Sequence, residues 1–120
     1  MDLLEVFKDS VDLVEIPANT MIFAEGRAGD KMFVIIEGSV KISLHDKMLA
    51  IAGPGEIVGE MALINSEIRS ASAATQTDCL MVPIDQSSFD SLLQHVPDFS
   101  LHVLNVLATR LHTAYQILED

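Results

Sequence analysis

Short hydrophobic runs separated by turn residues fill the chain from residue 11 to residue 84. Successive side chains of a strand point to opposite faces, so an alternating run indicates a strand with one buried face. The run at 40–44 alternates, whereas the run at 32–36 is almost wholly apolar, which is typical of a strand buried on both faces. The predicted strands lie at 11–16, 20–24, 32–36, 40–44, 48–51, 70–77 and 79–84, with a hairpin turn at 45–47.

Helical patterns flank this β-rich region. Residues 2–8 form a short amphipathic piece. Asp85 suits the N-cap of a helix over 86–95, and Pro97 suits the first turn of a final helix that ends near residue 119.

Seven or eight short strands without helices between them predict a mainly β fold, a double-stranded β-helix or jelly-roll barrel. A parallel α/β sheet would need helices between its strands. We expect one domain over 1–120: a short N-terminal helix at 1–10, the jelly-roll at 11–84, and a C-terminal hinge with long dimerisation helices at 85–120.

The final predicted helix carries apolar residues on more than one face. One set recurs at intervals of three and four residues, the spacing of a heptad seam. Its own barrel and a symmetric partner helix would cover two such surfaces, which predicts a homodimer. The alternative is a single wide face packed wholly on the barrel. The seam is Leu101, Leu104, Ala108, Leu111, Tyr115 and Leu118, and the second set is Val103, Val106, Leu107, Ala114 and Ile117.

The charge of the chain argues against two classes of partner. The formal net charge is -11, and the acidic residues are spread along the chain. A nucleic-acid surface would show a basic stripe or patch, and an anionic membrane repels an acidic surface. We therefore expect neither nucleic acid nor membrane as a partner.

Cysteine usage and the N-terminus are typical of a cytoplasmic protein. Cys79 is the single cysteine, so no intramolecular disulfide forms, and we expect a buried structural thiol because no basic neighbour that could activate it is evident. The first five residues lack the basic start and apolar stretch of a signal peptide, and no run approaches the length of a membrane span.

The segment from Gly59 to Ser72 carries the candidate chemistry. A glycine-rich turn precedes a predicted helix of about two turns at most, and free N–H groups at such a terminus favour an anion. Arg69, nine positions after Glu60, adds a two-pronged clamp for phosphate or carboxylate oxygens. A bound phosphate would repel the carboxylate of Glu60. The presence of this carboxylate therefore indicates a ligand that also carries hydroxyl groups, as a ribose does. An anion and a polyol together suggest a nucleotide.

This segment resembles the phosphate-binding cassette of the cyclic nucleotide-binding domain family. That pattern runs Gly-Glu, a hydrophobic residue, Ala-Leu, a short spacer, and Arg-Ser/Thr-Ala. The resemblance extends upstream to Glu25-Gly26, Gly29-Asp30 and residues 32–38, and downstream to Val96-Pro97-Asp98, which is similar to the hinge of catabolite activator-type domains. The matching cassette residues are Gly59, Glu60, Met61, Ala62, Leu63, Arg69, Ser70 and Ala71.

The resemblance implies a cyclic nucleoside monophosphate as the ligand. Its phosphate is expected on Arg69 and Ser70, and its ribose 2′-hydroxyl on Glu60. Ala62 and Ala71 are small enough for a close backbone approach. The expected ligand-binding residues are Val58, Gly59, Glu60, Met61, Ala62, Arg69, Ser70 and Ala71.

Base recognition is less well defined. The resemblance places Arg110 at a last-helix arginine that faces the nucleotide, but Ala114-Tyr115 replaces the Thr-Ser pair that contacts adenine there. Thr113 lies one position away and is the second candidate base contact, with a solvent-facing threonine as the alternative. Family members that favour cGMP often carry Thr where Ser70 stands, which favours cAMP over cGMP.

The sequence shows no sign of catalysis. The four histidines, His45, His95, His102 and His112, have no metal-ligand spacing, and no nucleophile–base pair stands out. We expect a stand-alone, ligand-responsive regulatory or sensor domain that is not an enzyme and holds no metal, with an effector protein as a further candidate partner. Two alternatives stay open: a regulatory module cut from, or acting in trans on, an effector, and an interaction or scaffold module of the same fold that binds no nucleotide.

Overall fold

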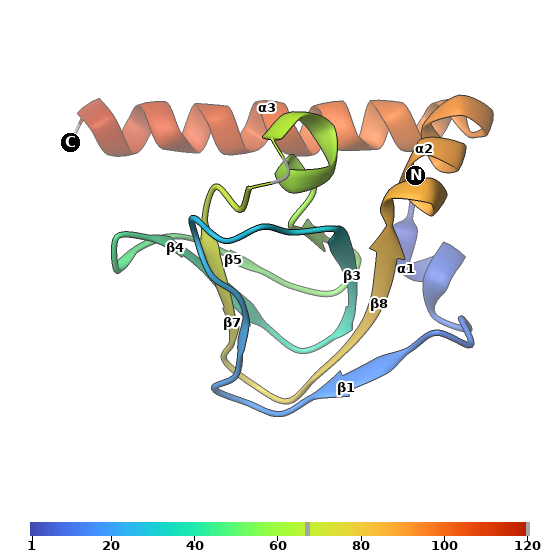
Figure 1. The fold of residues 1–120 in the computed structure, drawn as a ribbon, viewed down its shortest axis with the longest axis horizontal. Helices are drawn as coiled ribbons and strands as arrows, with labels where there is room; N and C mark the ends of the chain where they lie inside the picture. The colour runs from blue at the N-terminus through green and yellow to red at the C-terminus, as the bar shows by residue number, and fades with distance from the viewer. Residues whose placement is uncertain (67, 120) are drawn as a thin grey trace. The chain divides into compact units, whose positions relative to one another are not determined.

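The computed structural model describes residues 1–66 and 68–119 (Figure 1). They form two compact units: one spans Asp2–Gln86, and the other comprises Met1 and the segment that begins at Ser87. The first unit holds every described strand. The elements are α1 (Leu3–Phe7), β1 (Val14–Ile16), β2 (Met21–Phe23), β3 (Lys31–Glu37), β4 (Val40–Leu44), β5 (Lys47–Ala52), β6 (Ile57–Val58), η1 (Ala62–Ser66), β7 (Ser72–Thr75), β8 (Cys79–Asp85), α2 (Gln86–His95) and α3 (Pro97–Glu119).

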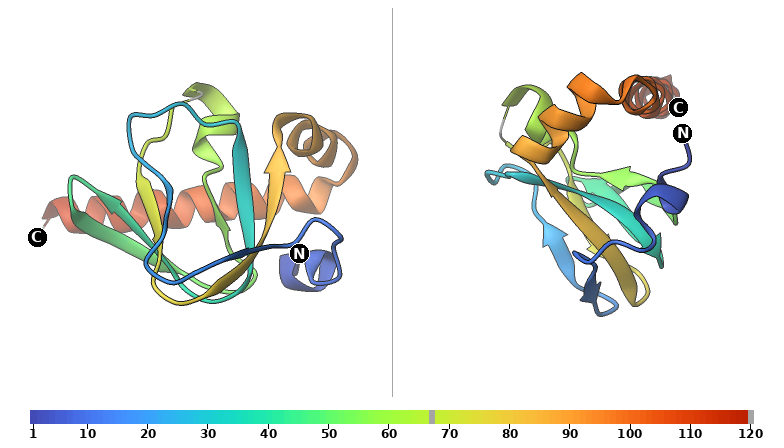
Figure 2. Two further views of the ribbon diagram at one scale, coloured as in Figure 1. Left: turned by 60° about the horizontal axis from the view of Figure 1, so that its bottom comes forward. Right: turned by 90° about the vertical axis from the view of Figure 1, so that its right-hand side faces the viewer.

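The strands form two antiparallel four-stranded sheets in the orders β1-β8-β3-β6 and β2-β7-β4-β5 (Figure 2). The pairs β1–β8, β2–β7, β3–β6 and β4–β5 show that the chain is an antiparallel ribbon folded about the β4–β5 hairpin. Rolled into two sheets, such a ribbon is a jelly roll. The predicted fold class is therefore confirmed.

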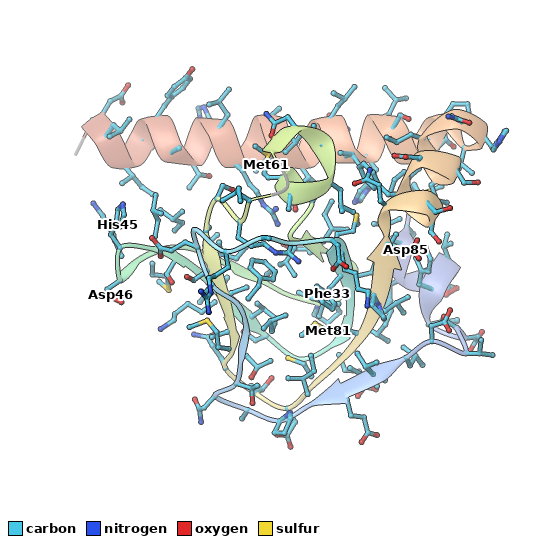
Figure 3. All side chains as sticks on the ribbon, viewed as in Figure 1. Phe33, His45, Asp46, Met61, Met81 and Asp85 are labelled. Carbon is cyan, nitrogen blue, oxygen red and sulfur yellow. The ribbon has the colours of Figure 1, made fainter. Side chains whose placement is uncertain are left out.

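Strand β3 is buried on both faces, as its apolar pattern predicts. Val34 and Ile35 point to opposite faces and are both fully buried. Ile35 belongs to a core cluster to which both sheets contribute, and Phe33 and Met81 lie in the same interior (Figure 3). Helix α1 packs against β3 and buries Leu3. This core therefore fixes the ends of the strands that flank residues 59–72, the cassette.

The β4–β5 hairpin turns through His45 and Asp46, whose φ angles are +51° and +64° (Figure 3). Two successive positive φ angles suit the twist of a two-residue hairpin, and Asn-Gly is the usual pair. Here the carboxylate of Glu25 accepts a hydrogen bond from the His45 backbone N–H at 3.1 Å, and His45 Nδ1 lies 3.2 Å from the same carboxylate. Glu25 therefore helps to hold a turn that contains no glycine.

Several strand boundaries differ from the sequence predictions. Strand β1 begins at Val14 rather than at residue 11, and Val11 is 97 % exposed. Strand β7 spans Ser72–Thr75 rather than 70–77. Asp85, the expected N-cap, is the last residue of β8, and α2 runs from Gln86 to His95 as predicted. Strand β6 was not predicted, because two residues are too few to show a period.

Replacing Asp46 with glycine should stabilise the protein. An L-residue with a left-handed backbone is strained by roughly 1 kcal/mol, and glycine is not. We expect Asp46→Gly to raise the free energy of unfolding by about 0.5–1 kcal/mol in urea titrations. Lys47→Gly, in the first position of β5, is the matched control and should lower it by a similar amount. A loss of stability for both variants would contradict the strain at Asp46.

Candidate functional site

The cassette, residues 59–72, leaves β6, passes through η1 and enters β7. Its first residue, Gly59, has a φ of +85°. A Cβ atom there would lie 2.6 Å from Arg69 Nη1 and 3.3 Å from the carbonyl oxygen of Lys31. Glycine is therefore required at this position for two reasons: the backbone has a positive φ, and a Cβ atom would collide with the side chain of Arg69.

The side chain of Arg69 lies in a narrow slot and is 6 % exposed. Its Nη1 donates a hydrogen bond to the carbonyl oxygen of Gly59 at 3.0 Å, and its Cζ stands 4.1 Å from the ring centroid of Phe23. A Cβ atom on Gly29 would overlap Arg69 Nε and lie 2.8 Å from its Cδ. A carbonyl, an aromatic face and a bare Cα thus surround the guanidinium. We call these three neighbours, Phe23, Gly29 and Gly59, the arginine slot.

The backbone of Arg69 is fixed by the loop that precedes β3. Its N–H donates to the carbonyl oxygen of Arg27 at 2.8 Å, and its own carbonyl accepts from the N–H of Gly26 at 2.9 Å. An isolated antiparallel bridge joins Ala28 and Ile68 beside them. The loop that supplies Gly29 therefore also fixes the position of the Arg69 backbone from which the side chain extends.

Burial, the main influence, lowers the pKa of Arg69, and the charges of Asp30 and Glu60 oppose this shift. A guanidinium nevertheless stays charged in proteins. Within residues 1–66 and 68–119, no carboxylate lies at ion-pair distance from Arg69, and its buried Nε has no hydrogen-bond partner. Such a cation has unused capacity for a bound anion.

Glu60 is the second buried charged side chain of the cassette, with 1 % exposure. Its backbone carbonyl accepts from the N–H of Leu63 at 3.0 Å as the chain enters η1. Its charge acts on the pKa of Arg69, so the two groups belong to one electrostatic site. The site thus combines a carboxylate, which accepts hydrogen bonds, with a guanidinium, which donates them.

The other expected cassette residues lie in the same unit as Glu60 and Arg69. The predicted short helix is present as η1, five residues of π-helical geometry. Ser70 is exposed, and its hydroxyl makes no hydrogen bond within the part of the chain that the structure describes. Val58 and Ala62 are buried, and Met61 (Figure 3) and Ala71 are half-buried.

The two candidate base contacts lie on α3, in the other compact unit. Arg110 and Thr113 are three residues apart and therefore share a helix face. The hydroxyl of Thr113 donates to the carbonyl oxygen of Thr109 at 3.0 Å, so it would have to leave this bond to donate to a base. Their contact with a nucleotide stays a prediction.

Sequence reasoning missed Phe23 and the reason for Gly29. The sequence pattern places Phe23 in an ordinary strand, and Gly29 enters only through the family resemblance. The absence of a larger residue in Gly29-Asp30 was the one available signal of a close approach. Nothing local indicates that the partner of this glycine is Arg69.

Two further searches bear on the site and on the chain. Among the described residues, no three His, Cys, Asp or Glu side chains are grouped so that they could hold a metal ion. None of the described helices is both long enough and apolar enough to span a bilayer.

The sequence model of one family, the cyclic nucleotide-binding domain, matches residues 13–96, which is more than half of the chain. The chain belongs to this family. The matched residues include both sheets, the whole cassette and α2, so the resemblance noted from the cassette is confirmed.

Several known proteins are similar to this cyclic nucleotide-binding domain. A CRP-like cAMP-activated global transcriptional regulator of Mycobacterium tuberculosis is 34% identical over 112 residues, which cover 89% of this chain and 50% of the regulator. The catabolite activator protein of Thermus thermophilus superimposes with a TM-score of 0.77 at 28% identity, over 89% of this chain and 53% of that one. The chain thus spans about half the length of these relatives.

A third relative is known with two nucleotides. The EAL enzyme Bd1971 superimposes in its cGMP-bound form with a TM-score of 0.67 at 34% identity, over 87% of this chain and 29% of that chain. Its cAMP-bound form gives a TM-score of 0.66 at 33% identity, over 89% of this chain and 30% of that chain.

Removing the charge of Arg69 should not weaken the ligand-free fold. A buried charge without a counter-ion is unfavourable, and methionine keeps most of the apolar stem. We expect Arg69→Met to raise the free energy of unfolding without ligand by about 1 kcal/mol, measured by urea denaturation. Arg27→Met, at an exposed arginine, is the matched control and should change it by less than about 0.5 kcal/mol. A clear loss of stability in Arg69→Met would show that the arginine supports the fold itself.

Proposed function

We propose that this domain binds a cyclic nucleoside monophosphate, with cAMP preferred over cGMP, and acts as a ligand-responsive regulatory domain. The phosphate lies against Arg69 and the hydroxyl of Ser70, and the ribose 2′-hydroxyl donates to Glu60. Arg110 and Thr113 are the proposed base contacts. The role is binding, without catalysis, and one domain comprises the whole chain.

The observation that carries this proposal is the buried, charged guanidinium of Arg69, which no carboxylate neutralises among the described residues. Its unpartnered Nε can donate to an anionic oxygen. Glu60, buried beside it, would repel a plain phosphate ion. A ligand with an anionic group and a nearby hydroxyl satisfies both side chains.

Two observations outside the arginine site support the preference for cAMP. The Mycobacterium relative is described as cAMP-activated. Ser70 stands where domains similar to this one often carry Thr when they favour cGMP. Since the EAL enzyme has been obtained with either nucleotide, the preference is one of degree.

Two alternatives use the same fold. In one, the chain works as a regulatory module on a separate or detached effector, as its half-length match to the Mycobacterium regulator would allow. In the other, it is an interaction or scaffold module that binds no nucleotide. A cassette with a buried arginine and a buried carboxylate disfavours the second.

Calorimetric titration with cAMP and cGMP tests the proposed ligand. We expect saturable binding of both, with a lower Kd for cAMP. Arg69→Ala should weaken binding at least about 100-fold, because a charge-assisted, two-pronged contact is lost. Glu60→Ala should weaken it about 10- to 100-fold through the ribose hydroxyl.

Lys41→Ala is the matched control, because it removes one positive charge from an exposed position on β4. It should bind like the wild type. No heat with millimolar nucleotide would reject the proposal, and equal binding by the Arg69→Ala, Glu60→Ala double variant would reject the site.

We also propose that the chain forms a homodimer through α3. The five large seam residues of this helix are all at least half exposed in the single chain, and they lie along one stripe. An apolar stripe of this length in water favours a partner helix. Their exposed fractions are 60% for Leu101, 60% for Leu104, 53% for Leu111, 56% for Tyr115 and 82% for Leu118.

Light scattering tests the dimer. The chain has a mass of 13.1 kDa, so we expect about twice this value with the wild-type protein. Leu111→Glu places a charge in the seam and should give the monomer. Thr109→Glu adds the same charge at an exposed position off the seam and should stay dimeric. A wild-type monomer with and without nucleotide would remove the proposal.

A further inference from the structure

The contact between Arg69 and Phe23 joins the proposed phosphate ligand to the hydrophobic core. The Cζ of Arg69 lies 4.1 Å from the ring centroid of Phe23, within the range of a cation–π interaction. Phe23 in turn stacks on Phe33, with centroids 6.4 Å apart and an interplanar angle of 20°. Both rings pack against the core cluster between the sheets. A continuous line of contacts thus runs from the core to the guanidinium.

We propose that Phe23 is a positioning residue, whose ring holds the guanidinium of Arg69 in a fixed orientation before the nucleotide arrives. The proposal rests on the proposed function, because it concerns the group that would bind the phosphate. Beyond that function, the proposal states that an aromatic platform, together with Gly29 and Gly59, preorganises the arginine, and that none of the described carboxylates does so.

The choice of an aromatic partner has a physical reason. A carboxylate at ion-pair distance would also orient Arg69, but it would compete with the phosphate for the same N–H groups. A ring attracts the flat face of the cation and leaves its in-plane donors available. Within residues 1–66 and 68–119, the guanidinium makes one direct hydrogen bond, from Nη1 to the carbonyl oxygen of Gly59, which uses one of its five N–H donors.

The slot also explains why lysine would be a poor substitute. Gly29 leaves no space for a Cβ atom beside Nε and Cδ, so the slot is shaped around a planar group. An ammonium is a compact point charge that cannot stack flat on Phe23 or use two prongs on one phosphate. The geometry therefore selects arginine for its shape as well as its charge.

Nuclear magnetic resonance of the ligand-free protein tests the positioning. The chain has three arginines, at 27, 69 and 110, so their side-chain Nε–Hε signals are readily assigned by substitution. We expect the signal of Arg69 to be displaced by the ring current of Phe23. Phe23→Leu should return it toward the position typical of an exposed arginine, Phe23→Tyr should restore the displacement, and Phe7→Leu, a remote control in α1, should leave it unchanged.

Calorimetry with cAMP tests the consequence for binding. Phe23→Leu should weaken binding about 5- to 30-fold, the range that a partly desolvated cation–π contact supports, and Phe23→Tyr should bind within about 2-fold of the wild type. In the Arg69→Met background, which has no cation to face the ring, Phe23→Leu should weaken residual binding by less than about 2-fold. A ring that acted only through general packing would cause equal losses in both backgrounds, which would overturn the proposal.

The two measurements separate the failure of this inference from the failure of the proposed function. An Arg69 signal that does not respond to Phe23→Leu overturns the positioning role, whether or not cAMP binds. If the Arg69 signal responds to Phe23→Leu as expected but the wild-type protein binds no cAMP, the positioning role is supported. In that case the proposed nucleotide ligand is rejected.

Discussion

A guanidinium group that leaves water must find other partners for its charge and its donors. Arg69 is almost fully buried, yet the described protein offers it one carbonyl oxygen and one aromatic face and no carboxylate at ion-pair distance. Its lowered pKa reflects this deficit. The surrounding residues, two glycines and Phe23, allow the cation to approach closely, because the glycines have no side chain and the ring presents a flat face. An anionic ligand would complete the solvation that the protein leaves partial.

The two sheets are needed because this slot has walls from distant parts of the chain. Gly59 follows β6 in one sheet, whereas Phe23 ends β2 and Arg69 precedes β7 in the other. The width of the slot therefore depends on the core between the sheets. Packing of that core at crystal-like density keeps such a distance constant. A rigid jelly roll is thus a suitable support for a site whose walls come from both sheets.

The features that the sequence could predict are those whose residues lie close together along the chain. Glu60 and Arg69 lie in one continuous segment, so their spacing was visible, and the burial of β3 followed from its own composition. The contact of Phe23 with Arg69 joins residues in separate segments, and no local pattern records it. The left-handed turn at His45 lacks the usual glycine because Glu25, another distant residue, holds it. The missed features are thus tertiary ones, apart from the two-residue strand β6.

The division into two compact units limits which contacts could turn binding into a signal. A ligand shifts a conformational equilibrium only by the difference between its affinities for the two states. Arg69 and Glu60 belong to the sheet unit, so a nucleotide that contacted them alone would stabilise that unit without a direct preference for any arrangement of α3. Arg110 and Thr113 are the only proposed ligand contacts in the helical unit. If the domain is a sensor, the phosphate and ribose contacts supply affinity, and the base contact is the one that supplies coupling.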